Sequence, residues 1–226
     1  MQTLKNIYDG SIFKMPDLTP EQWAEQDRRV REWERCQAIE RLQRRLAESG
    51  IPERYRKAAA DVPQIAEWAD EPTTGLLIQG KTGKGKTHQA CGALIRFMTG
   101  ENDPLKPPRS RTGRFITFDD LLRECKATFS NHDTEEAVIG RYANTGMLLI
   151  DDMGKERATE WSLPIIFTII NKRYMSGKPT IITTQYDGKT LLQRMTVNGD
   201  IETGRAIISR MTEYQRVFLD GKDWRL

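Results

Sequence analysis

The eight residues from Gly80 to Thr87, Gly-Lys-Thr-Gly-Lys-Gly-Lys-Thr, constrain the fold of this chain more than any other feature. They fill every fixed position of the pattern G-x-x-x-x-G-K-[ST], and the apolar run Leu76 to Gln79 precedes them. A strand that enters such a loop and a helix that leaves it aim backbone N–H groups and the positive end of the helix at one point. The pattern therefore predicts a phosphate-binding loop between a strand and a helix.

Two side chains of this loop have separate predicted tasks. Lys86 is expected to reach the β and γ phosphates of ATP, and Thr87 to offer its hydroxyl to Mg²⁺. The candidate ATP-binding residues are Gly80, Lys81, Thr82, Gly83, Lys84, Gly85, Lys86, Thr87 and His88.

A second element carries two adjacent acids. The apolar run Met147 to Ile150 ends in Asp151 and Asp152, and the carboxyl end of a parallel strand lies at the ligand crevice. Asp151 is expected to hold Mg²⁺ together with Thr87, and Asp152 to orient or deprotonate the attacking water. Alone, the acid pair would equally suit a turn after a strand. The phosphate-binding loop favours the catalytic interpretation.

Short apolar runs alternate with helical stretches from Gly75 onward. This alternation is typical of parallel strands joined by helices, and it predicts a three-layer α/β domain over residues 51–226, with Ile51 to Asp70 as a transitional stretch. The predicted strands are Leu76 to Gln79, Phe115 to Phe118, Met147 to Ile150, Thr180 to Thr184 and Arg216 to Leu219.

Residues 1–50 predict a helical arm. Thr19 suits the N-cap, Pro20 the first helical position, and Gln22 completes a capping box. The helix is expected to run to Gly50, and its apolar stripe is Trp23, Val30, Trp33, Ile39, Leu42 and Leu46. Two interpretations stay open: the stripe packs on the parent domain, or the arm docks on a partner protein.

Composition excludes several classes of protein. The net charge is +3, so any contact with nucleic acid must come from a local basic patch. Three distant cysteines form no disulfide framework or zinc motif, and the isolated His88 and His132 are expected to be ordinary surface or helix residues. No apolar stretch approaches a membrane span, so the chain is expected to avoid membranes and to be cytoplasmic.

Further segments match one family in order. Over roughly Ile51 to Arg225 the chain resembles the DnaC/DnaI-type helicase loaders and the related IstB transposition ATPases. The matching segments are Ile51 to Tyr55, Gly80 to Thr87, Phe118 to Leu122, Leu148 to Gly154, Thr159 to Trp161, Ile169 to Tyr174, Pro179 to Thr184, Ile208 to Glu213 and Gly221 to Arg225.

The resemblance implies an AAA+ P-loop fold of three αβα layers, with a parallel five-stranded sheet in the order 5-1-4-3-2. It also implies ATP bound between subunits of a homo-oligomer that forms in the presence of ATP or DNA. Such an assembly grips single-stranded DNA and loads a hexameric, DnaB-type replicative helicase during DNA replication. A short arm without a zinc motif suits a loader of phage or prophage origin.

Residue roles follow from the same resemblance. Gln185 stands where the family's sensor 1 usually has Asn, and Arg210 stands in the arginine-finger box, with Arg205 and Arg173 in reserve. Arg225 matches a terminal arginine with a phosphate-sensing role. Many hydrolysing relatives have Glu where this chain has the shorter Asp152, so slow turnover is expected. The expected catalytic residues are Asp152, Lys86, Gln185 and Arg210.

The resemblance also implies contact with DNA between residues 119 and 142, where similar proteins have a DNA-contacting insertion. Lys126 and Arg141 are the candidate phosphate contacts, and Phe129 and Tyr142 are available to stack on bases. The alternative is that both aromatic residues belong to the core and that both charges face solvent.

Three other functions are alternatives to the helicase loader. An IstB-like transposition helper would have the same core, and a nucleotide-gated scaffold would bind ATP with negligible hydrolysis. A small-molecule kinase is disfavoured because no lid segment follows the fourth strand.

Overall fold

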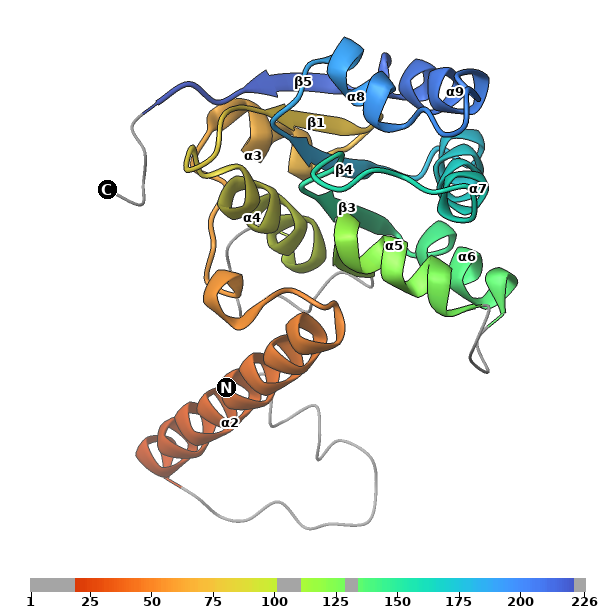
Figure 1. Ribbon diagram of the computed structural model, residues 1–226. Coiled ribbons are helices and arrows are strands. Elements are labelled where there is room, and N and C mark those ends of the chain that lie inside the picture. The colour runs from red at the N-terminus through yellow and green to blue at the C-terminus, as the bar shows by residue number, and fades with distance from the viewer. Residues whose placement is uncertain (1–18, 101–110, 129–133, 222–226) are drawn as a thin grey trace.

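A five-stranded parallel sheet forms the centre of the protein (Figure 1). The computed structural model describes residues 19–100, 111–128 and 134–221. The strands lie in the order β2-β3-β4-β1-β5, which confirms the predicted order 5-1-4-3-2 read from the other edge. Their bounds are β1 Leu76–Gln79, β2 Gly113–Thr117, β3 Met147–Asp151, β4 Thr180–Thr184 and β5 Gln215–Phe218.

Helices cover both faces of this sheet and complete the predicted three layers (Figure 1). On one face lie α3 (Pro63–Asp70), α4 (Lys86–Thr99) and the end of α2 (Pro20–Glu48). On the other face lie α5 (Phe118–Ala127), α6 (Glu135–Ala143), α7 (Ser162–Met175), α8 (Gly188–Arg194) and α9 (Glu202–Met211).

The central strand β3 shows why the predicted strands are unbroken apolar runs. Met147 and Leu149 point into the cluster under α3 and α4, whereas Leu148 and Ile150 point into the cluster under α5 to α9. Successive side chains of a strand face opposite sides, so a sheet covered twice needs apolar residues at every position. All four are fully buried, and each contributes roughly 1.5 to 3 kcal/mol to stability.

The segment from Ile51 to Asp70 is more ordered than the sequence predicted. It contains a short 3-10 helix, η1 (Glu53–Tyr55), and then α3, which begins with Pro63 at its first position. Ile65 and Trp68 of α3 are buried in the core cluster that includes α4. The expectation of a transitional stretch was wrong because Pro63 starts a helix here and does not interrupt one.

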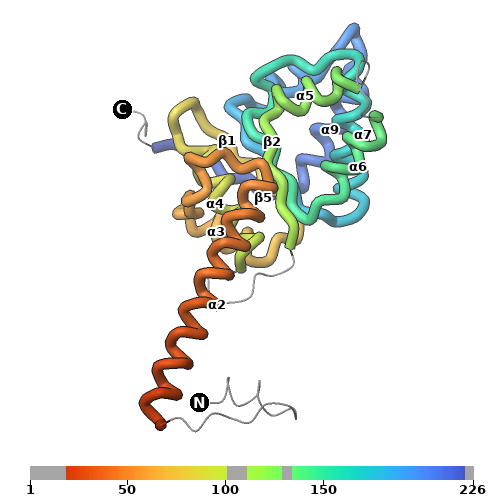
Figure 2. Tube along the Cα trace, turned by 90° about the horizontal axis from the view of Figure 1, so that it is seen from below, coloured from red at the N-terminus to blue at the C-terminus, as the bar shows by residue number. Residues whose placement is uncertain are grey.

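The described residues of the arm form a single long helix that begins where its cap predicts. Thr19 Oγ1 accepts the Gln22 N–H at 3.3 Å, and Gln22 Oε1 accepts the Thr19 N–H at 2.9 Å. Figure 2 shows α2 projecting from the domain, with its last turns nearest the sheet. Of the predicted stripe, Leu42 and Leu46 pack against the core cluster, whereas Trp33 is 64% exposed.

The end of α2 is fastened to the domain by polar contacts. Arg45 Nη2 donates to the carbonyl oxygens of Met98 at 3.3 Å and Arg111 at 2.6 Å. The Ser49 carbonyl accepts the Phe115 N–H at 2.7 Å, which joins the arm to β2. The packing interpretation therefore holds for the last two turns of the stripe.

Candidate nucleotide-binding site

The Gly80 to Thr87 loop connects β1 to α4 in a backbone shape that glycine permits. Gly85, the N-cap residue of α4, has a φ of 79°, in the left-handed region. Gly80 has a φ of 157°, and a Cβ there would lie 2.5 Å from the Leu219 carbonyl oxygen. The loop therefore lies directly against the chain that leaves β5.

Thr87 and Asp151 meet although 64 residues separate them. Thr87 Oγ1 lies 2.9 Å and 3.1 Å from the two carboxylate oxygens of Asp151. The pairing arises because Thr87 is in the first turn of α4, and Asp151 ends β3 at the same edge of the sheet. The sequence thus predicted correctly that these two candidate magnesium ligands would lie together.

The Asp151 carboxyl is buried, with 5% of its surface exposed. Burial raises the pKa of Asp151 above its ordinary value, and hydrogen bonds from Thr183 and Thr87 together with the charge of Lys86 oppose that rise. Thr183 Oγ1 donates to Asp151 Oδ1 at 2.6 Å. A buried carboxylate in this setting gains from a cation that neutralises it.

Lys86 is folded inward over the loop. Its side chain is buried, and Nζ donates to the Lys81 carbonyl oxygen at 3.1 Å. Its charge is close enough to lower the pKa of Asp151. The loop therefore brings one ammonium group, one hydroxyl and one carboxylate together at the first turn of a helix.

Asp152 has a backbone conformation that few residues with a side chain adopt. Its φ is 55°, and its N–H donates to Thr183 Oγ1 at 2.9 Å. Left-handed backbone is uncommon for residues other than glycine, although Asp and Asn tolerate it best. Asp152 lines the same groove as Lys86 and Thr87, beside the space where a nucleotide would lie.

A groove of about 780 Å³ runs along the loop. Its phosphate end is lined by Thr82 to Thr87 with Asp152, Lys155 and Gln185. The rest of the lining comes from the chain after the arm, the start of α3 and the end of β5, and includes Arg54, Tyr55, Asp61, Val62, Gln64, Val217 and Phe218. The volume of the groove is large enough for a nucleoside together with its phosphates.

Two polar residues of this site had no predicted role. Gln89 is 9% exposed; its Oε1 accepts the Val62 N–H at 3.1 Å, and its Nε2 donates to Asp61 Oδ2 at 3.3 Å. It thereby fixes one wall of the groove to α4. Thr183 orients both acids. In the sequence, Gln89 could have been noticed as a glutamine among small and apolar helix residues. Thr183 could have been noticed as part of a threonine pair that ends an apolar strand.

Gln185 lies at the phosphate end of the groove, as the sensor 1 interpretation requires. It follows β4, and its Oε1 accepts the Thr82 hydroxyl at 3.0 Å. Its Nε2 donates to the Tyr186 hydroxyl at 2.9 Å. The amide therefore already spans from the phosphate-binding loop to the chain beyond β4.

Arg210 and Arg205 do not line the groove of their own chain. Arg210 Nε donates to Asn171 Oδ1 at 2.7 Å, and its guanidinium lies 4.9 Å from the centre of the Phe167 ring. Arg205 is exposed and pairs with Glu202 at 2.7 Å. Both belong to α9, so any role at a nucleotide would be in a neighbouring protomer.

Arg173 is wholly buried, which removes it from the candidate arginine fingers. It donates one hydrogen bond to the Thr180 hydroxyl and five to backbone carbonyl oxygens. Burial lowers its pKa to about 10, so it stays cationic at neutral pH. The reserve role predicted for it was wrong because these contacts hold the side chain inside the domain.

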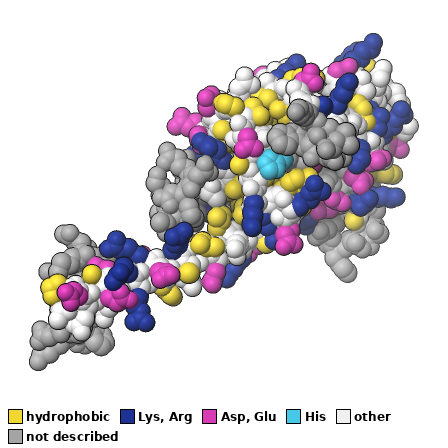
Figure 3. All heavy atoms as spheres, turned by 90° about the vertical axis from the view of Figure 1, so that its left-hand side faces the viewer, with side chains coloured by type: hydrophobic (Ala, Val, Ile, Leu, Met, Phe, Trp, Pro, Cys, Tyr) yellow, Lys and Arg dark blue, Asp and Glu magenta, His cyan; other side chains and the backbone are white. Residues whose placement is uncertain are grey.

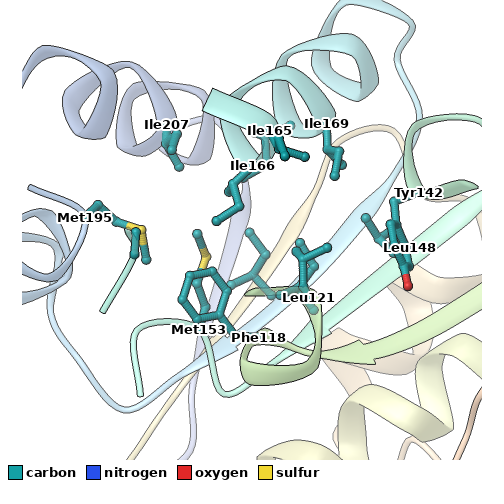
Figure 4. Packing of buried hydrophobic residues seen from close by; sticks show 14 of the residues in the cluster. Phe118, Leu121, Tyr142, Leu148, Met153, Ile165, Ile166, Ile169, Met195 and Ile207 are labelled. Atoms are coloured by element: carbon teal, nitrogen blue, oxygen red, sulfur yellow. The ribbon is translucent and has the colours of Figure 1, made fainter. Parts of the chain in front are cut away.

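The candidate DNA contacts are only partly accessible. Tyr142 is 2% exposed and lies among the core residues in Figure 4, so the base-stacking prediction for it was wrong and the core alternative is correct. Arg141 pairs with Glu124 at 2.7 Å, whereas Lys126 is exposed on α5. Phe129, His132 and Arg225 lie outside the described residues.

His88 is half-buried and lines the groove. His88 Nε2 lies 3.7 Å from Asp61 Oδ2 at the edge of the groove.

Over the described ranges, no cluster of three or more His, Cys, Asp or Glu side chains could hold a metal ion. In the same part of the chain, no helix combines the length and apolarity that crossing a bilayer requires.

Comparison with known proteins bears on this geometry. The family model of the IstB-like ATP binding protein matches residues 18–226. The chain belongs to this family. The match includes the phosphate-binding loop, both acids and the segment with Arg210, and it confirms the resemblance inferred from the sequence motifs.

Individual relatives of this chain are distant in sequence. The replicative helicase loader DnaC of Escherichia coli K12 is 27% identical over 128 residues, which cover 56% of this chain and 49% of the loader. The phage-like element PBSX protein XkdC of Bacillus subtilis 168 is 25% identical over 163 residues, covering 70% of this chain and 53% of XkdC. The chain thus spans about half the length of these relatives.

A solved structure confirms the fold. The crystal structure of the DnaC helicase loader superposes with a TM-score of 0.59 at 24% identity, covering 75% of this chain and 100% of that chain. The AAA+ architecture predicted from the sequence is therefore correct, because the strand order and the helices on both faces of the sheet also match the prediction.

Proposed function

We propose that this protein binds MgATP in the groove along Gly80 to Thr87, hydrolyses it, and uses that reaction to load a hexameric replicative helicase onto single-stranded DNA. The observation that carries the proposal is the meeting of Thr87 and Asp151 at 2.9 Å beside a helix N-terminus, in a family that binds ATP. The loader activity is supported by similarity to DnaC, which is named as a replicative helicase loader.

The residues present fit a magnesium ion. Thr87 offers a hydroxyl and the buried Asp151 a carboxylate, which are the hard oxygen ligands that Mg²⁺ prefers. Few protein ligands are needed, because phosphate oxygens and water complete the shell of this ion at nucleotide sites. When bound, the ion would neutralise charge on the phosphates.

The protein's own groups then divide the remaining work. Lys86 places a positive charge at the phosphates, and the N–H groups of the first helical turn bind the same oxygens. Asp152 accepts a proton from the attacking water or orients it, and Gln185 positions that water or the terminal phosphate. Because Asp152 is shorter than Glu, we propose that turnover is slow.

Asp152→Asn tests the hydrolytic step. Asn is nearly the same size and tolerates the φ of 55°, but it cannot accept the proton. ATP hydrolysis is expected to fall by on the order of 100-fold or more, with ATP affinity little changed. Phosphate release at saturating ATP and binding of a fluorescent ATP analogue measure the two quantities.

Unchanged phosphate release by Asp152→Asn would contradict the role of this residue. If the wild-type protein and Lys86→Ala also released phosphate at the same background rate, the nucleotide-gated scaffold would replace the ATPase.

We propose that the arm formed by residues 1–50 binds the helicase. Helix α2 is the part of this arm that the structure describes. Most of α2 projects from the domain, and Figure 3 shows dark blue and magenta side chains interspersed along it. The helix has equal numbers of arginine and acidic residues, seven of each, so net charge cannot select the partner. The exposed indole of Trp33 is the strongest apolar anchor on this surface.

Trp33→Ala tests the arm. Binding of the full-length protein to the host's hexameric helicase is expected to weaken by about 30-fold or more, which corresponds to roughly 2 kcal/mol at an interface hot spot. The basal ATPase rate is expected to stay unchanged, because the side chain lies on the projecting part of α2. Biolayer interferometry and phosphate release provide the measurements.

Trp161→Ala is the matched control, because Trp161 is 57% exposed but lies at the start of α7. Equal losses for both variants would contradict a specific role for the arm. Recovery of a transposase and not of a helicase in pull-downs with the wild-type protein would favour the transposition helper.

Assembly completes the proposed mechanism. Arg210 would approach the ATP of a neighbouring protomer in a homo-oligomer formed with ATP or DNA, where a guanidinium stabilises negative charge in the transition state. Lys126 is the exposed candidate for contact with single-stranded DNA. Both roles rest on the family resemblance.

A further inference from the structure

Arg194, at the end of α8, is fastened to the loop that follows β3. Its Nε donates to the Gly154 carbonyl oxygen, and its Nη2 donates to the Lys155 carbonyl oxygen at 2.6 Å. Its own carbonyl accepts the Ala158 N–H at 3.3 Å. Side chain and backbone of one residue therefore hold the loop at three places.

That loop begins with Asp152 and is packed tightly. Gly154 has a φ of 86°, and a Cβ there would lie 2.5 Å from Leu191 Cδ1 and 3.2 Å from Tyr186 Cδ2. The left-handed backbone of Asp152 costs about 1 to 2 kcal/mol, so neighbouring contacts must maintain it. Arg194 supplies hydrogen bonds that anchor this loop to α8, in addition to the packing of Gly154 on Leu191.

The same guanidinium also contacts the chain that follows β4. It lies 4.6 Å from the centre of the Tyr186 ring, and the Tyr186 hydroxyl accepts the Gln185 amide at 2.9 Å. Gln185 in turn accepts the Thr82 hydroxyl. One chain of contacts thus joins Arg194 to the phosphate-binding loop.

These two sets of contacts converge on the two residues proposed to handle the water. We propose that Arg194 is a positioning residue that holds Asp152, through the loop after β3, and Gln185, through Tyr186, in the geometry that ATP hydrolysis requires. This inference rests on the proposed ATPase function. Arginine suits the task because a planar guanidinium can donate in two directions and stack on a ring at once, which an ammonium group cannot do.

Arg194→Lys tests the proposal, because it keeps the charge but loses the forked donation and most of the stacking. The kcat for ATP is expected to fall by about 10- to 100-fold, since small displacements of catalytic groups have effects of that size. Affinity for a fluorescent ATP analogue is expected to change less than about threefold, because Arg194 does not line the groove. The thermal midpoint is expected to stay within a few degrees of wild type.

Arg123→Lys is the matched control, as Arg123 is exposed on α5 and pairs with Asp119 and Asp120. Unchanged kcat in Arg194→Lys would overturn the proposal. So would a parallel loss of kcat, nucleotide affinity and thermal stability, because that pattern indicates general unfolding.

Tyr186→Phe separates the contact of Arg194 with Tyr186 from its contacts with the loop after β3. It keeps the ring under Arg194 but removes the hydroxyl that accepts the Gln185 amide. A smaller loss of kcat is expected, and the double variant with Arg194→Lys should be less impaired than the product of the single effects. If the losses of kcat in the two single variants simply multiply in the double variant, Arg194 does not act on Gln185 through Tyr186.

The proposal and the function it rests on fail in different ways. Wild-type protein that binds ATP without hydrolysing it would refute the ATPase and, with it, this role of Arg194. Hydrolysis by wild type with normal kcat in Arg194→Lys would refute the positioning role alone.

Discussion

Replacing Lys86 by Ala is expected to abolish measurable ATP hydrolysis and to weaken ATP binding by at least about 30-fold. Lys86 is buried beside Asp151 and supplies positive charge to the phosphates at the centre of the site. Removing one partner of a buried charge interaction costs roughly 2 to 5 kcal/mol, and 2 kcal/mol already corresponds to about 30-fold in affinity. Isothermal titration with ATP and magnesium, together with phosphate release, measures both losses.

Lys172→Ala provides the control for this prediction. Lys172 is exposed near the end of α7 and does not line the groove, so removing its charge should leave both quantities near wild type. Circular dichroism should show that both variants are folded. If Lys86→Ala bound ATP as tightly as the wild-type protein does, the phosphates could not lie beside Lys86.

Replacing Arg173 by Met is expected to destabilise the domain by about 3 to 5 kcal/mol, because several buried acceptors lose their donor and each unsatisfied buried group costs roughly 1 to 3 kcal/mol. The five carbonyl oxygens that Arg173 binds belong to Tyr142, Ala143, Thr145, Gly146 and Pro179, which lie in the chain leading into β3 and β4. Without the guanidinium, these buried acceptors lose their donor. The thermal midpoint is expected to fall by roughly 6 to 20 °C.

Arg205→Met is the matched control for the stability experiment. Arg205 pairs with Glu202 on an exposed surface, and such pairs contribute little to stability. Its midpoint should stay within about 2 °C of wild type. A midpoint for Arg173→Met equal to that of Arg205→Met would show that the buried network does not stabilise the domain.

The burial of Arg173 also clarifies why its sequence position was misleading. It lies in a segment that matches the family, and so an arginine there could equally serve a nucleotide or the fold. Only its six hydrogen bonds inside the domain distinguish these uses. Arg210 differs because its side chain is partly exposed on α9, and its role in a neighbouring site stays a prediction.

Much of the fold was predictable because local patterns carried it. The first strand was predicted at its observed bounds, Leu76–Gln79, since a strand buried on both faces reads as an unbroken apolar run. The arm was predicted from the capping box at Thr19, and that box is present. The helix α3 was missed because its short pattern follows a proline, and in a sequence a proline can indicate either a break or a beginning.

Local patterns in the chain were enough to predict the phosphate-binding loop and its partner acid. Glycines at constrained positions dictate the loop, and the rule that parallel strands end at one edge brings Asp151 to Thr87 across 64 residues. The three-dimensional packing was needed to show that Tyr142 and Arg173 are buried and that Arg194 links the loop after β3 to Tyr186. These outcomes depend on which carbonyls and rings surround each side chain, and such contacts come from distant segments that no local pattern specifies.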